Sequence, residues 1–294
     1  MPLLKRPLTV ILAAGIVLAA CVACSPLKTL NALTPSASYT KSADISYGAD
    51  PRQKLDIYAP RNIAVGAPVV VFFYGGNWRM GDRADYAFVG EALASRGILA
   101  VIADYRLYPD ASYPGFVEDS AAAVAWTARR VRSYGGNPER LFVMGHSAGA
   151  YNAAMVALDA RWLGGQGMKP DVLRGWIGLS GPYDFLPIEN PDVKPVFHFP
   201  DTPPSSQPIN HVSADAPPAL LIASEDDSLV NPGRNTGHLA SRLREKGVEV
   251  ETRYYDRTSH ATLVATLSRP LRGLAPVLDD VERFVASHGA EARD

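Results

Sequence analysis

The chain has 294 residues, of which 47% are hydrophobic and 20% are charged, and its formal net charge is −1. A chain of this length can bury a large core in one or two domains without disulfide staples. The near-neutral charge argues against nucleic acid as a partner, because there is no basic surplus to neutralise phosphates.

The first residues have the pattern of a bacterial export signal. Two basic residues precede an apolar run over residues 8–20, which is too short for a comfortable membrane span. Residues 18–21, at the end of this run, have the form of a lipoprotein cleavage box that ends at Cys21, and a second possible box ends at Cys24. The pattern predicts a signal over residues 1–24 and a lipid on Cys21 or Cys24, which would be the only contact with a membrane.

This prediction places the protein in a bacterial cell envelope as a lipoprotein, with a secreted or periplasmic soluble protein as the alternative. Both cysteines lie in the signal, so the folded domain is expected to contain neither a disulfide nor a thiolate metal site. Residues 25–43 are rich in Ser, Thr, Ala and Pro, and we expect them to form a flexible tether. A single catalytic domain is expected over residues 44–290.

Apolar strands and amphipathic helices alternate through this domain. Apolar runs predict strands over residues 54–58, 68–74, 98–103, 141–144, 173–179, 219–223 and 248–255. Helical spacing predicts helices over residues 83–96, 114–131, 148–159, 232–246 and 263–287, the last of them interrupted by two prolines. The alternation predicts an α/β fold with a mostly parallel central sheet and helices on both faces.

Residues 145–149 read G-H-S-A-G and lie between a predicted buried strand and a predicted helix. In that context the pattern makes a sharp turn that presents Ser147 at the carboxyl end of the strand. Glycine is needed at 145 and 149, because a side chain at either flank of so tight a turn would collide with the neighbouring strand or helix. Ser147 is therefore the candidate nucleophile.

A serine hydroxyl becomes a good nucleophile when a base takes its proton and a carboxylate orients that base. In doubly wound hydrolases the acid and the histidine follow the serine in that order, in loops at one sheet edge. His260 follows the last predicted strand by a short polar loop and is the candidate base. The acidic run 225–227 follows the preceding strand. Asp227 is the candidate acid and Asp226 the alternative, since spacing alone does not separate neighbours.

The tetrahedral intermediate of such a reaction also needs hydrogen-bond donors for its oxyanion. Residues 74–78 (Y-G-G-N-W) close a central strand with a glycine-rich loop, so Gly76 and Asn77 are candidates to supply N–H groups. Ala148, at the amino end of the helix after the nucleophile, is a third candidate. The alternative interpretation of residues 74–78 is a plain Gly-Gly turn.

Five motifs in order resemble the hormone-sensitive-lipase-like and acetyl-esterase-like branch of the α/β-hydrolases, over residues 45–285. They are YGGNWR at 74–79, DYRLYP at 104–109, YGGNP at 134–138, GHSAG at 145–149 and DDSLV at 226–230. The resemblance implies the α/β-hydrolase fold and hydrolysis of a small-molecule carboxylic ester without metal or cofactor. It also places the family's catalytic aspartate on Asp227.

The glycine-rich loop departs from this family at two positions. Tyr74 stands where the family usually has His, and Asn77 stands where it often has a third Gly. A tyrosine hydroxyl can still make hydrogen bonds, so Tyr74 is expected to brace the loop in place of the His. Asn77 places a side chain near the acyl site.

The Pro-rich segment 183–218 is predicted to form a lid or rim that contributes Phe185, Phe197 and Phe199 to an acyl or aryl pocket. An insertion without substrate contact is the alternative. The expected substrate is an ester of a small to medium acyl or aryl group. An amidase or arylformamidase with the same triad is a competing interpretation. A non-catalytic binding protein on this fold is another, although such proteins typically lose a triad member, and all three are present here.

Overall fold

The computed structural model describes residues 26–62 and 66–289. Their strands form one eight-stranded sheet with the strand order β1-β2-β4-β3-β5-β6-β7-β8. β1 (Tyr39–Ser46) pairs antiparallel with β2 (Lys54–Pro60), and β2 pairs antiparallel with β4 (Leu99–Ala103). All other neighbouring strands are parallel: β3 (Ala67–Phe73), β5 (Gly136–His146), β6 (Leu173–Leu179), β7 (Ala219–Ser224) and β8 (Val250–Tyr255). The predicted α/β-hydrolase fold is confirmed.

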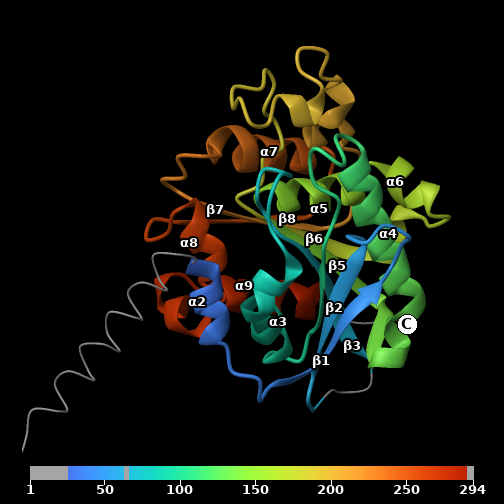
Figure 1. Ribbon diagram of the computed structural model, residues 1–294. Coiled ribbons are helices and arrows are strands. Elements are labelled where there is room, and N and C mark those ends of the chain that lie inside the picture. Colours follow the sequence, from blue (N-terminus) through green and yellow to red (C-terminus); the bar gives the residue numbers. More distant parts are fainter. Residues whose placement is uncertain (1–25, 63–65, 290–294) are drawn as a thin grey trace, which may run out of the picture.

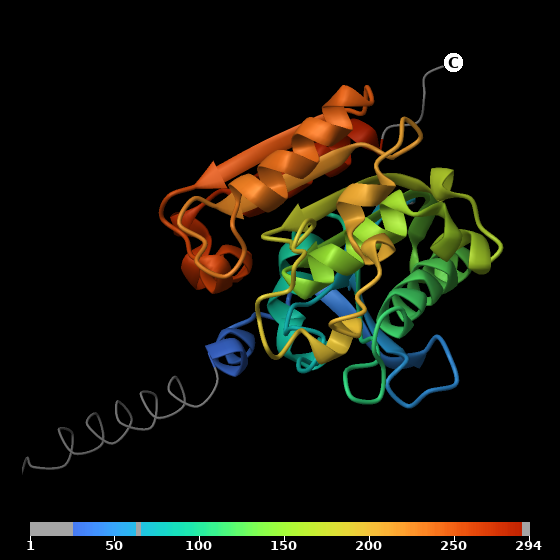
Figure 2. The same cartoon turned by 90° about the horizontal axis from the view of Figure 1, so that it is seen from above.

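Helices cover both faces of this sheet (Figures 1 and 2). On one face, α3 (Ala87–Ala94) packs on β4 and contacts α9 (Val277–His288), which packs on β6 and β7. On the other face, α4 (Gly115–Arg130) and α5 (Ala148–Leu158) pack against each other and against β3 and β5, and α6 (Ala160–Gly165) contacts both helices. Because both faces are covered, β4 and β7 are buried at every residue, which explains why every residue of β4 and all of β7 except Ser224 are apolar.

The remaining helical elements are short. α7 (His238–Glu245) follows a π-helical turn, Gly233–Gly237, and packs on β8, while α8 (His260–Ala265) follows β8 after a short loop. Single 3-10 turns lie at Arg83–Tyr86, Val131–Tyr134, Pro170–Val172, Pro195–Phe197, Pro204–Ser206, Pro208–His211 and Arg269–Leu274. The predicted helix over 263–287 is therefore three separate pieces, because proline at 270 and 276 cannot continue a helix.

Residues 26–43 belong to the folded domain, so the prediction of a flexible tether over residues 25–43 is wrong for the part that the structure describes. α2 (Pro26–Ala32) packs Leu27 and Leu30 against the core, and the Asn31 side chain donates to the Ala84 carbonyl at 2.6 Å. β1 then begins at Tyr39. The predicted signal, with its lipid on Cys21 or Cys24, lies outside the described residues.

Among the described helices, none combines the length and the apolar character needed to span a membrane.

The parallel register places the carboxyl ends of β3, β5, β6, β7 and β8 at one edge of the sheet. Phe73 of β3 pairs with Gly145 of β5, and the next residue of β5, His146, pairs with Leu179 at the end of β6. The last residues of β7 and β8 are likewise in register. The loops that leave these ends therefore converge, as is typical of ligand sites in parallel α/β sheets.

Candidate active site

Ser147 occupies the turn between β5 and α5 with φ 54° and ψ −121°, a conformation that non-glycine residues rarely adopt. The turn is possible because its two flanking glycines lack side chains. A Cβ on Gly145 would collide with the carbonyl of Gly149, and a Cβ on Gly149 would collide with the carbonyl of Phe73. The Ser147 N–H donates to the Leu179 carbonyl at 2.9 Å, which ties the turn to the next strand.

His260 reaches Ser147 from the loop that follows the edge strand β8. Its Nε2 lies 2.8 Å from Ser147 Oγ, and its Nδ1 lies 2.8 Å from Asp227 Oδ2. The structure thus brings the three residues of the predicted triad into one hydrogen-bonded chain. The other histidines that follow Ser147 have hydrogen-bond partners elsewhere in the fold: His198, His211, His238 and His288.

The backbone around His260 is held by local hydrogen bonds. His260 is the first residue of α8, and Ser259 caps this helix in a capping box with Thr262. Just before the cap, the Thr258 carbonyl accepts a hydrogen bond from the Ser224 hydroxyl at the end of β7. The loop is therefore anchored to the strand whose following loop carries Asp227.

Asp227, and not Asp226, faces His260. Asp227 is 7% exposed, whereas Asp226 is exposed to solvent. Its Oδ1 accepts hydrogen bonds from the N–H groups of Leu229 and Val230, both at 2.9 Å, which leaves Oδ2 for His260. Burial raises the pKa of Asp227, but the hydrogen bonds from His260 and from the two N–H groups outweigh it and hold the pKa below 3.8. The carboxylate is therefore ionised at neutral pH.

The glycine-rich loop after β3 lies directly beside Ser147. A Cβ on Gly75 would lie 2.9 Å from the Ser147 Cβ, and Gly76 has a φ of 132° that other residues rarely adopt. Asn77 has a φ of 52°, in the left-handed region that Asn tolerates better than most residues, so it can replace a third glycine. Asn77 and Ala148 line a pocket together with Ser147, whereas Gly76 is not part of its lining.

Tyr74 precedes this loop and lies fully buried between the stacked rings of Tyr86 and Tyr105. The Tyr74 hydroxyl donates a hydrogen bond to Asp104 Oδ1 at 2.6 Å and accepts one from Arg52 at 2.8 Å. The main-chain carbonyl of Tyr74 accepts a third hydrogen bond, from the Tyr105 hydroxyl at 2.7 Å. Burial, together with the neighbouring Tyr105 and Asp104, raises the pKa of Tyr74 well above 10.0, so the hydroxyl keeps its proton. These contacts suit the bracing role expected for Tyr74.

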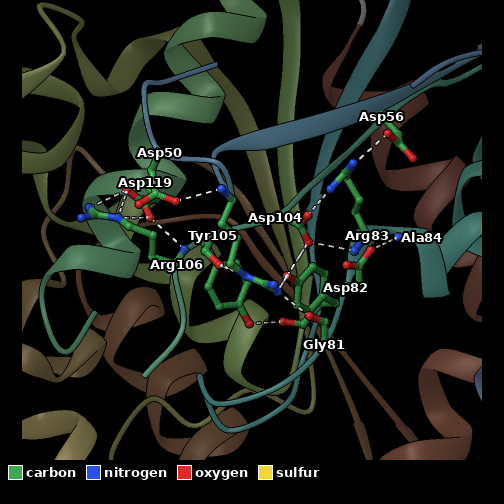
Figure 3. A network of polar contacts seen from close by, with 12 residues as sticks. Asp50, Asp56, Gly81, Asp82, Arg83, Ala84, Asp104, Tyr105, Arg106 and Asp119 are labelled. Carbon is green, nitrogen blue, oxygen red and sulfur yellow. Dashed lines mark hydrogen bonds and ion pairs between the residues drawn. The ribbon is translucent and has the colours of Figure 1, made fainter. Parts of the chain in front are cut away.

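Asp104 connects this brace to the antiparallel edge of the sheet (Figure 3). Arg83 forms ion pairs with Asp104, with Asp56 of β2 and with Asp44 of β1. The sequence marked residues 104–109 only through a family resemblance and assigned them no role. The role of Asp104 could have been inferred from one signal, an acidic residue placed directly after a fully buried strand.

A pocket of about 260 Å³ opens above Ser147. The segment between β6 and β7, drawn in yellow and gold at the top of Figure 1, supplies part of its wall. Phe185 lines the pocket as expected. Phe197 is instead fully buried behind it, and Phe199 is 44% exposed, with Lys194 over its ring. The expectation that Phe197 and Phe199 line the pocket is therefore wrong.

The pocket lining also includes charged side chains. Arg234 lies 3.6 Å from Asp184, and both side chains line the pocket. In residues 26–62 and 66–289, no group of three His, Cys, Asp or Glu side chains is arranged to hold a metal ion.

Comparison with known proteins places this geometry in a family. Residues 55–243, more than half of the chain, match the family model described as BD-FAE, and the matched span includes Ser147 and Asp227. The chain belongs to the BD-FAE family. This membership and the esterase relatives below confirm the predicted resemblance to the α/β-hydrolase esterases.

Several proteins that are similar in sequence to this BD-FAE family member have names that describe them as esterases. Probable isoprenylcysteine alpha-carbonyl methylesterase ICMEL1 of Arabidopsis thaliana is 27% identical over 84% of this chain and 56% of its own length. Probable isoprenylcysteine alpha-carbonyl methylesterase ICME of Oryza sativa subsp. japonica is 29% identical over 85% of this chain and 65% of its own length. Esterase LipC of Mycobacterium tuberculosis is 28% identical over 70% and 56%. The chain thus spans between 56% and 65% of the length of these relatives.

Solved structures share the fold of this BD-FAE member. A thermostable esterase from Pseudomonas putida is 24% identical with a TM-score of 0.69, over 90% of this chain and 89% of that chain. An esterase from Pyrobaculum calidifontis is 23% identical with a TM-score of 0.71, over the same shares. At these identities the likeness establishes the fold.

Proposed function

We propose that the protein is a serine carboxylesterase that hydrolyses esters of small to medium acyl or aryl groups through Ser147, His260 and Asp227. The observation that carries this proposal is the hydrogen-bonded chain from Ser147 Oγ through both ring nitrogens of His260 to Asp227 Oδ2, with both contacts at 2.8 Å. Membership of the BD-FAE family and the esterase names of the relatives support carboxylic ester hydrolysis.

In the proposed acylation step, Ser147 Oγ attacks the ester carbonyl carbon while its proton passes to Nε2 of His260. The ionised Asp227 accepts the hydrogen bond from Nδ1–H and stabilises the imidazolium. The bond between carbonyl carbon and alcohol oxygen then breaks as Nε2 returns the proton to that oxygen, which leaves the acyl group on Ser147. In deacylation, water gives a proton to Nε2 and attacks the acyl carbon, and Ser147 recovers its proton as the acid leaves.

The oxyanion of both tetrahedral intermediates would bind to the main-chain N–H groups of Asn77 and Ala148. Both residues line the pocket beside Ser147. The Ala148 N–H lies in the first turn of the 11-residue α5, where the helix offers no carbonyl partner and its dipole favours negative charge. Gly76 is the weaker candidate, because it does not line the pocket and serves mainly to permit the turn of the loop.

The order of the strands indicates on which side of Ser147 the acyl group and the alcohol of the ester would lie. The alcohol must leave beside His260, which protonates it, and β7 and β8 lie on one side of β5. β3, whose loop carries Trp78, lies on the other side, so we expect the acyl group to face Trp78 and Phe185. Trp78 is 2% exposed and packs edge-on against Tyr151, so it forms a rigid wall that favours short acyl groups.

An acyl series of p-nitrophenyl esters tests this proposal. We expect kcat/KM to be highest for acetate or butyrate and lowest for laurate. Trp78→Ala should raise the ratio of octanoate to acetate kcat/KM by about tenfold or more, because the deleted indole opens space for added methylenes. A native preference for laurate would contradict the small-acyl assignment. Hydrolysis of p-nitroacetanilide as fast as p-nitrophenyl acetate would favour an amidase instead.

We also propose, from the pattern of residues 1–24 alone, that the protein is exported and lipidated on Cys21 or Cys24. Mass spectrometry of the mature N-terminus should find an acylated cysteine, and Cys21→Ser and Cys24→Ser made separately should show which one carries the lipid. An unmodified mature N-terminus would contradict the lipoprotein proposal and leave a soluble exported protein.

A further inference from the structure

The second residue of the G-H-S-A-G turn, His146, lies between two parts of the proposed catalytic machinery. Its side chain is buried, and its Nε2 lies 2.8 Å from the main-chain carbonyl oxygen of His260. The two imidazole rings are 5.0 Å apart between centroids. On the other side, a Cβ added to Gly75 would lie 3.2 Å from His146 Nδ1. The ring therefore contacts both the base and the loop that precedes the oxyanion donors.

The hydrogen bond fixes where the proton of this ring lies. A carbonyl oxygen only accepts, so Nε2 of His146 must carry the hydrogen and donate it to the His260 carbonyl. In the neutral ring Nδ1 then carries none, and within the described part of the chain Nδ1 has no hydrogen-bond partner. Burial, together with the nearby His260, lowers the pKa of His146 from 6.5 to about 3. The ring is thus a neutral donor throughout the pH range in which esterases are assayed.

The base itself is attached to a short element. α8 has six residues and begins at His260, so the backbone that carries the imidazole lies at the very end of a helix. Asp227 restrains the imidazole ring through Nδ1. The only side chain that is seen to donate to the His260 carbonyl, among the residues that the structure describes, is His146.

We infer that His146 is a positioning residue for the base: its Nε2–H anchors the main chain of His260 while Asp227 anchors the ring, and the two anchors together aim His260 Nε2 at Ser147. The inference rests on the proposed function, because it assigns His146 a role only through His260. Anchoring a side chain at both ends matters because a displacement of about 1 Å in a catalytic group can cost about 10²-fold in rate.

Three substitutions at His146 separate this role from mere packing. In His146→Gln, the side-chain amide nitrogen can occupy the place of Nε2 and donate to the same carbonyl. In His146→Asn, the shorter side chain places its amide nitrogen near the position of Nδ1, which faces Gly75 and not His260. His146→Leu fills the space without any donor.

We expect kcat for p-nitrophenyl acetate to fall about 10- to 100-fold in His146→Leu and His146→Asn, with KM changed by less than about threefold. His146→Gln should recover kcat to within about fivefold of the native protein, because it restores the donor. Thermal unfolding of all three variants identifies any that fail to fold. Should His146→Leu fail to fold, the comparison of His146→Gln with His146→Asn carries the test alone.

A pH profile tests whether His146 acts as a neutral donor. The titratable groups that face His146 are His260 and Asp227, and both are retained in every variant. The ratio of kcat between the native protein and His146→Gln should be constant from pH 5 to pH 9, since a neutral donor does not titrate there. A ratio that changes through this range, equal losses in His146→Gln and His146→Leu, or full activity in His146→Leu would each overturn the inference. Undiminished activity in Ser147→Ala would instead overturn the proposed function, so the two failures are distinguishable.

Discussion

Two neighbouring aspartates, Asp226 and Asp227, differ in burial because of the turn that follows β7. The side chain of Asp227 is enclosed by the N–H groups of the next turn and by His260, while Asp226 faces solvent. We expect Asp227→Asn to lower kcat for p-nitrophenyl acetate by about 10⁴-fold, because an amide at this position disfavours the tautomer that His260 needs.

The matched control is Asp226→Asn, which removes the same charge one residue away. It should leave kcat within about threefold of the native value, because an exposed carboxylate makes little difference to a site it does not contact. A greater loss in Asp226→Asn than in Asp227→Asn would reverse the assignment of the acid.

The sequence predicts a site residue well when a local motif or its position after a strand is enough to identify it. Ser147 and His260 follow from one motif and from one position after the last strand, and the structure joins them at 2.8 Å. The contact of His146 with the His260 carbonyl joins positions 114 residues apart, so no local pattern reveals it. For the same reason, spacing could not choose between the two aspartates, because burial depends on the folded turn.

At the scale of elements, the loop after β3 depends on the hydrogen bonds that hold Tyr74. Tyr74→Phe removes the hydroxyl that joins the partly buried Arg52 to the buried Asp104, and it leaves each of them with one partner fewer. We expect a loss of about 1–3 kcal/mol in the free energy of unfolding, measured by urea denaturation. We also expect kcat to fall with KM nearly unchanged, because the loop that carries the proposed oxyanion donor Asn77 loosens.

Tyr86→Phe is the matched control for this prediction. Its ring stacks on Tyr74 at 5.4 Å in the same aromatic group, but the substitution leaves the chain from Arg52 through Tyr74 to Asp104 intact. It should change kcat far less than Tyr74→Phe. Native kcat in Tyr74→Phe would show that the hydroxyl does not brace the loop.

The elements that the sequence predicted best are those whose own residues are buried. The strand predicted over residues 173–179 agrees with β6 at both ends, because every residue of β6 except Arg174 is buried and the run is therefore mostly apolar. β1 was missed because most of its residues are exposed, and it exists through pairing with β2. The tether was predicted from composition, which does not record such non-local pairing.

At the scale of the whole molecule, Asp56 joins the antiparallel edge to the parallel sheet. It is 2% exposed and pairs with Lys41 at 2.7 Å and with Arg83 at 3.0 Å. Burial raises the pKa of Asp56, but hydrogen bonds from Lys41, the Asp44 N–H and Arg83 outweigh it and lower the pKa below 3.8. Because the folded-state pKa lies below the unfolded one, this stabilisation is present above about pH 4 and is lost as pH falls through the folded pKa.

Asp56→Asn should therefore lower the free energy of unfolding by about 2–4 kcal/mol at pH 7, and the loss should shrink as the pH is brought below 4. Urea denaturation at pH 7 and pH 3 measures both values. Asp279→Asn is the control, because Asp279 is 56% exposed in its ion pair with Arg96 and should contribute less than about 1 kcal/mol. Equal losses for Asp56→Asn at the two pH values would contradict this account.

Hydrolysis of p-nitrophenyl acetate by the purified native protein beside Ser147→Ala tests directly whether Ser147 is the nucleophile. The substitution removes one oxygen atom from the turn between β5 and α5 and leaves His260 and Asp227 in place. We expect the native protein to hydrolyse the ester and kcat to fall by about 10⁴- to 10⁶-fold in Ser147→Ala, with the same unfolding temperature within a few degrees. Equal rates in the two proteins would contradict the assignment of Ser147 as the nucleophile.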